Sequence, residues 1–174
     1  MGDGFFEYVQ RLELMAFFSG YPLVYAIVFV IRGNELKPNV AGRIASLLPF
    51  AYALAGTLYL GLQLKNLYPD YSLEHLKLSI EHPLLTIWGL LSILFWLPAL
   101  AKRPVLSLLH SLVVFFFLVK DLWVHYTSGS ENRDMIRNDM RIYTNSAILL
   151  IVCLLAIILF SLLLFRKTWR RAKY

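Results

Sequence analysis

Five long apolar runs constrain this chain more than any other feature of its sequence. They cover residues 12–31, 44–64, 84–100, 105–126 and 142–165, and each is close to the roughly 20 residues that a helix needs to cross a bilayer. Backbone groups in hydrocarbon must hydrogen-bond within their own segment, so runs of this length are expected to be helices. The sequence therefore predicts an all-α polytopic membrane protein. We expect residues 1–174 to form one integral membrane domain, a bundle of about five transmembrane helices.

Prolines and glycines predict where these helices are interrupted. Gly20 and Pro22 fall in the middle of the first run, where both residue types favour a break. The third run is the shortest, and it begins after Pro83 and has Pro98 near its end. The segment 102–104, Lys-Arg-Pro, separates it from the fourth run and predicts a tight hairpin.

The loops and motifs exclude several classes of protein. None of the loops has the length of a soluble domain, which excludes a separate catalytic or nucleic-acid-binding domain. The sequence has no nucleophile motif and no glycine-rich phosphate loop. Its one cysteine, Cys153, lies inside an apolar run, so a disulfide framework or a multi-thiolate metal site within the chain is also excluded.

Charged residues divide unequally between the two sides of the predicted bundle. An odd number of spans places the N-terminus and the loops 65–80 and 127–141 together, and that side holds seven of the 17 basic residues and ten of the 11 acids. Three of the four histidines lie there as well. The opposite side holds ten basic residues and one acid, Glu35. Because Lys and Arg favour the cytoplasmic side, we expect the C-terminus inside and the N-terminus outside, in a bacterial cytoplasmic membrane.

Residues 166–174 form a basic tail after the fifth run, and we expect this tail to be cytoplasmic. Its five basic residues suit the headgroups of an anionic leaflet, where each contributes about 1 kcal/mol. The predicted lipid-headgroup residues are Arg166, Lys167, Arg170, Arg171 and Lys173.

Ionisable residues inside the apolar runs point to one candidate site. Asp121 and His125 are four residues apart in the fourth run and share a helical face, and ionisable groups at such depth usually face a bundle interior. Tyr59 and Gln63 reach a similar depth on the second run. The sequence thus predicts a polar cluster in the outer half of the bundle, made of Tyr59, Gln63, Glu81, His82, Lys120, Asp121 and His125.

This cluster has several interpretations. It is structural if its members only hydrogen-bond to one another, and it is a proton relay or ion pathway if they line a wet cavity. His82, His125 and Asp121 are weak candidates for metal ligands. The segment around Glu81 and His82, with its following hairpin, resembles small bacterial b-type cytochromes of the membrane, which implies a haem with two axial histidines.

Three functions follow from these interpretations. The leading hypothesis is a non-catalytic accessory or scaffold subunit of a membrane complex, without a cofactor. The first alternative is a small proton- or ion-linked carrier that uses the polar cluster. The second alternative is a redox subunit with a b-type haem. The expected partners are the lipid bilayer and another membrane protein or a second copy of this chain, and nucleic acid is not among them.

Overall fold

A computed structural model describes residues 3–33, 38–69, 83–127 and 133–171, and these residues contain helices and no strand. The elements are α1 (Asp3–Phe18), α2 (Tyr21–Gly33), α3 (Pro38–Asn66), α5 (Pro83–Leu91), the 3₁₀ helix η1 (Ser92–Trp96), α6 (Pro98–Ala101), α7 (Pro104–Thr127) and α8 (Arg133–Arg171). Four stretches are long and apolar enough to cross a membrane, namely Tyr8–Val30, Gly42–Asn66, Pro104–Thr127 and Arg133–Leu163, and Pro83–Trp96 is a shorter apolar helix. The predicted all-α polytopic bundle is therefore confirmed.

The first span breaks between α1 and α2, where Gly20 and Pro22 predicted an interruption. Pro22 has no N–H to continue the helical hydrogen bonds, and the Gly20 N–H instead bonds to the Ser146 hydroxyl of α8 at 3.0 Å. A Cβ at Gly20 would lie 2.3 Å from the backbone nitrogen of Ala147. Only glycine fits at this position, because the break presses directly against the backbone of α8.

The third span is divided more finely than its apolar run suggested. It consists of α5, η1 and the four-residue helix α6, with extended backbone at Leu97. The nine residues of α5 at 1.5 Å each and the five of η1 at about 2.0 Å each span about 24 Å, which is less than the about 30 Å of bilayer hydrocarbon. This arm of the hairpin is therefore shorter than the four stretches that are long enough to cross a membrane.

Aromatic side chains fill the centre of the bundle around α3. Tyr52 and Tyr59 of α3 are fully buried, and both rings pack edge-on against Phe18 of α1. The Tyr52 ring also contacts Tyr21 of α2, with ring centroids 4.4 Å apart. These contacts join the first span to α3 on both sides of the break.

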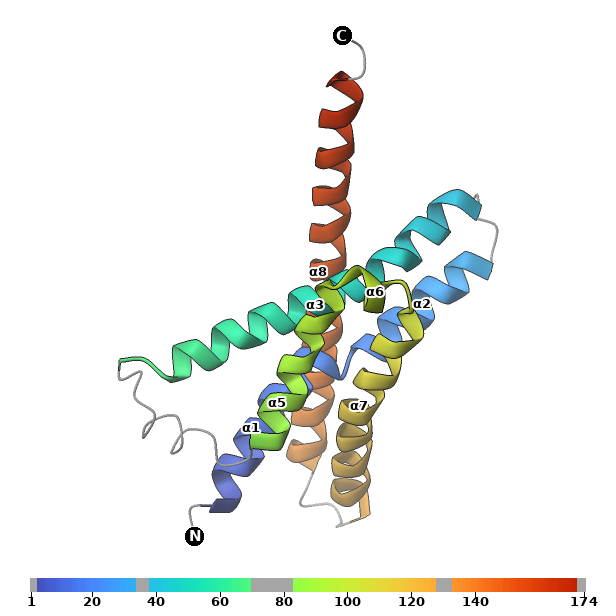
Figure 1. Cartoon of the computed structure of the whole chain (residues 1–174). Coiled ribbons are helices and arrows are strands. Elements are labelled where there is room, and N and C mark those ends of the chain that lie inside the picture. The colour runs from blue at the N-terminus through green and yellow to red at the C-terminus, as the bar shows by residue number, and fades with distance from the viewer. Residues whose placement is uncertain (1–2, 34–37, 70–82, 128–132, 172–174) are drawn as a thin grey trace.

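Helix α8 is much longer than its apolar run, since it begins at Arg133 and continues to Arg171. Figure 1 shows its C-terminal half rising past α6 and past the adjacent ends of α2 and α3. The first turn of α1 and the last turn of α8 lie at opposite ends of the molecule (Figure 1).

Candidate functional site

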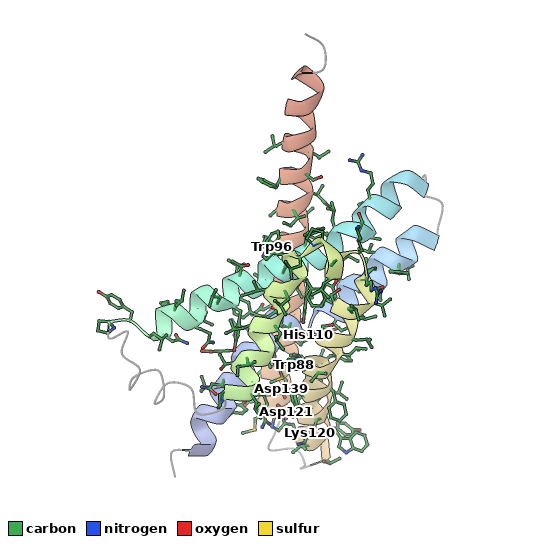
Figure 2. The ribbon with its side chains drawn as sticks, viewed as in Figure 1. Trp88, Trp96, His110, Lys120, Asp121 and Asp139 are labelled. Carbon is green, nitrogen blue, oxygen red and sulfur yellow. The ribbon has the colours of Figure 1, made fainter. Side chains whose placement is uncertain are left out.

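Charged side chains from three helices meet at the end of the bundle where α1 begins. Arg11 of α1 donates to Asp121 of α7, with 3.5 Å between Nη1 and Oδ1. His125 of α7 lies 2.7 Å from Asp139 of α8, measured from Nδ1 to Oδ2. Figure 2 shows Asp121 and Asp139 near each other at this end. We refer to Arg11, Asp121, His125 and Asp139 as the four-residue charge network.

Two carboxylate oxygens of this network are buried without a hydrogen-bond partner among the described residues, Asp121 Oδ2 and Asp139 Oδ1. The Asp139 side chain is only 1% exposed, against 13% for Asp121. Asp121 lies within electrostatic reach of Asp139, and the Tyr8 hydroxyl of α1 is within reach of both carboxylates. Buried polar atoms are nearly always hydrogen-bonded in proteins, so these two oxygens require a further donor.

Asp139 enters the bundle because it belongs to the buried stripe of α8. Asp139, Ser146, Leu150 and Cys153 are all buried, and their spacing of seven, four and three residues places them on one helical face. This periodicity is visible in the sequence, but it begins at Asp139, three residues before the apolar run that starts at 142. The sequence placed Asp139 in the predicted loop 127–141 and Arg11 just before the first apolar run, so neither residue was part of the predicted cluster.

The described residues of the predicted polar cluster do not form a single site. Asp121 and His125 both belong to the four-residue charge network. Lys120 is exposed on α7 and stays outside that network. Glu81 and His82 lie outside the described residues.

Tyr59 and Gln63 form two separate contacts of α3 with α1. Gln63 donates to Glu13 Oε2 at 3.0 Å, and Asn66 donates to the other oxygen of the same carboxylate at 3.3 Å. Tyr59 is buried among Phe17 and Phe18. The Glu13 carboxylate was not part of the predicted cluster, and it joins the C-terminal end of α3 to α1.

His110 of α7 is the centre of a second polar site, which lies deeper in the bundle. Its Nδ1 is 2.7 Å from the Tyr52 hydroxyl, and its Nε2 is 3.0 Å from the backbone carbonyl of Trp88. The Trp88 indole stacks on the imidazole with ring centroids 4.6 Å apart and 4° between the planes. Trp88 Nε1 also donates to the His110 carbonyl at 3.3 Å.

These contacts determine where the His110 proton lies. A carbonyl is only an acceptor, so Nε2 carries the hydrogen and Nδ1 of the neutral ring accepts from the Tyr52 hydroxyl. A haem iron bound at either ring nitrogen of His110 would displace one of these hydrogen bonds.

The described residues contain no group of three or more His, Cys, Asp or Glu side chains arranged to hold a metal ion. Among the weak metal candidates, His125 and Asp121 therefore meet no third ligand of this kind within the described part of the chain, and His82 lies outside it. Of the predicted headgroup residues, Arg166, Lys167, Arg170 and Arg171 fall on the last turns of α8, whereas Lys173 lies outside the described residues.

Comparison of the chain with protein family models, with curated proteins and with solved structures finds no match.

Proposed function

We propose that this multi-pass membrane protein is a non-catalytic accessory subunit that binds a larger membrane protein through the outer face of α8. The observation that carries the proposal is a continuous apolar stripe on that face. Its members are spaced four, three, four and four residues apart, and each is more than half exposed: Ile148, Val152, Leu155, Leu159 and Leu163. Residues at this spacing share one side of a helix.

The uneven lengths of the helices favour a protein partner for this stripe. Helices α5, η1, α6 and α7 form a hairpin that turns between α6 and α7. The first arm of this hairpin is short, and α8 continues well past the turn (Figure 1). The exposed residues Leu159 and Leu163 lie in this distal part of α8. Helices in lipid associate by close van der Waals packing, and a partner helix along the stripe gains such packing with α8.

The distribution of charges supports an orientation for this subunit. Lys102 and Arg103 follow α6, and Arg166, Lys167, Arg170 and Arg171 lie on the last turns of α8, away from the first turn of α1 (Figure 1). The end of the bundle near the first turn of α1 carries the four-residue charge network. In the proposed arrangement the basic end faces the cytoplasm and the N-terminus lies outside, in a bacterial cytoplasmic membrane.

Site-specific photo-crosslinking in native membranes tests the accessory role. A photoreactive amino acid is introduced singly at Val152, Leu155, Leu159 or Leu163, and at Phe116 and Leu109 of α7 as controls of similar exposure. We expect adducts of one mass, larger than two copies of this chain, at the α8 positions and none at the α7 controls.

Three outcomes of this experiment would contradict the proposal. Absence of any protein adduct along α8 means that the stripe faces lipid. Adducts at equal yield on α7 and α8 mean that contact is nonspecific. An adduct with twice the mass of the chain means self-association instead of an accessory role.

A further inference from the structure

The two buried oxygens without partners, Asp121 Oδ2 and Asp139 Oδ1, carry an inference that is independent of any partner protein. Each belongs to a carboxylate whose other oxygen already accepts a hydrogen bond, from Arg11 and His125 respectively. An unpartnered acceptor in a buried site costs about 1–3 kcal/mol, and more for a charged group. A hydrogen-bond donor placed between these two oxygens would therefore stabilise the folded protein.

The charges of the network show what is missing. Arg11 balances Asp121, and His125 Nδ1 lies 2.7 Å from Asp139 Oδ2. With a neutral imidazole and an ionised Asp139, the four side chains carry a net charge of minus one. The groups that act on Asp139 from the other helices are Asp121 and His125 of α7 and Tyr8 of α1, and Arg11 of α1 belongs to the set through its contact with Asp121. Arg11 is the only permanent cation of this set, and it is already engaged with Asp121.

One proton supplies both the missing charge and the missing donor. On Asp139 Oδ1 it neutralises the carboxylate and creates an O–H group. Asp121 Oδ2, which lies within electrostatic reach, is an acceptor without a donor among the described residues. The His125 hydrogen bond to Oδ2 remains unchanged, because a protonated carboxyl group keeps an acceptor oxygen.

We propose that the four-residue charge network is a proton-binding site in which Asp139 takes up one exchangeable proton on Oδ1. The proton comes from water at the adjacent end of the bundle and returns there, and no other bond forms or breaks. Since α1, α7 and α8 each contribute to the network, the protonation state of Asp139 sets the net charge at the place where these three helices meet.

Infrared spectroscopy of the whole protein in lipid bilayers tests this site directly. A protonated carboxyl group has a C=O stretching band above the amide region, and the band shifts in D₂O. We expect one such band in the wild-type protein, its complete loss in Asp139→Asn, and its retention in Asp134→Asn. Asp134 is the matched control because it is an exposed aspartate on the same helix.

The wild-type spectrum alone is able to overturn the proposal, whether or not a variant folds. No carboxyl band at any pH at which the wild-type protein remains folded means that Asp139 stays ionised. Persistence of the band in Asp139→Asn, or its loss in Asp134→Asn, assigns the proton to another group. Because the measurement needs no partner, its failure leaves the photo-crosslinking result on α8 unaffected.

Discussion

At the scale of single residues, Tyr52 and His110 show how this bundle keeps polar groups inside an apolar environment. The Tyr52 side chain is fully buried, and its hydroxyl is the partner of His110 Nδ1 at 2.7 Å. Trp88 covers the other ring nitrogen and one face of the imidazole. Every hydrogen-bonding atom of the His110 ring is thus satisfied within the bundle, as buried polar networks require.

Removal of the Tyr52 hydroxyl is expected to destabilise the protein. Tyr52→Phe keeps the ring contacts but leaves His110 Nδ1 without its donor, and an unsatisfied buried group costs about 1–3 kcal/mol. Unfolding in mixed micelles measures this change in free energy. Tyr126→Phe is the control, since Tyr126 is 75% exposed on α7, and an equal effect of the two substitutions would refute the buried network.

The sequence allowed part of the charged site to be predicted, for reasons that differ from residue to residue. Asp121 and His125 were identifiable because they lie inside an apolar run at helical spacing. Asp139 was not, because it precedes the fifth run and only the beginning of α8 at Arg133 makes it part of a transmembrane helix. Arg11 likewise precedes the first run, and its pairing with Asp121 depends on tertiary packing between α1 and α7.

At the scale of secondary-structure elements, close approach of backbones determines which breaks are tolerated. Gly20 and Pro22 predicted the break of the first span, and contact of Gly20 with α8 is the reason that glycine is needed there. The change to η1 was not predictable from the third run. Ser92, the first residue of η1, lies against Gly56 of α3, and this tertiary contact cannot be read from the third run alone.

Substitution of Gly20 tests the contact between the first span and α8. In Gly20→Ala the new Cβ would lie within 2.3–2.8 Å of backbone atoms of Ser146 and Ala147, which must move apart, and we expect a loss of about 1–3 kcal/mol. Gly61→Ala in α3 is the control, because nothing lies within 4 Å of the added carbon. That control should be stabilised by about 0.5–1 kcal/mol.

Thermal unfolding in one detergent compares these two glycine variants under identical conditions. The expected order of melting temperatures is Gly61→Ala, wild type, then Gly20→Ala. If Gly20→Ala melts at or above the wild-type temperature, α8 does not pack against the break as described.

At the scale of the whole molecule, the five apolar runs predict that the chain crosses the membrane in alternating directions. The unequal distribution of Lys and Arg predicts which side is cytoplasmic. The structure adds that the α5–α7 hairpin has one short arm, the 14 residues of Pro83–Trp96. A hairpin with such an arm crosses the bilayer only if α6 and the following turn complete the passage, so the side on which Lys102 emerges decides the topology.

Labelling of single cysteines with a membrane-impermeant thiol reagent in intact cells tests this claim most directly. The native Cys153 is buried in α8 and is replaced by alanine, and cysteine is introduced singly at Tyr68, Lys102 or Thr127, all of which are exposed. Alternating crossings with the N-terminus outside predict that Tyr68→Cys and Thr127→Cys are labelled, whereas Lys102→Cys is labelled only after the cells are opened. Labelling of Lys102→Cys in intact cells together with the other two would mean that the hairpin turns back within the membrane, which would contradict the five-crossing bundle.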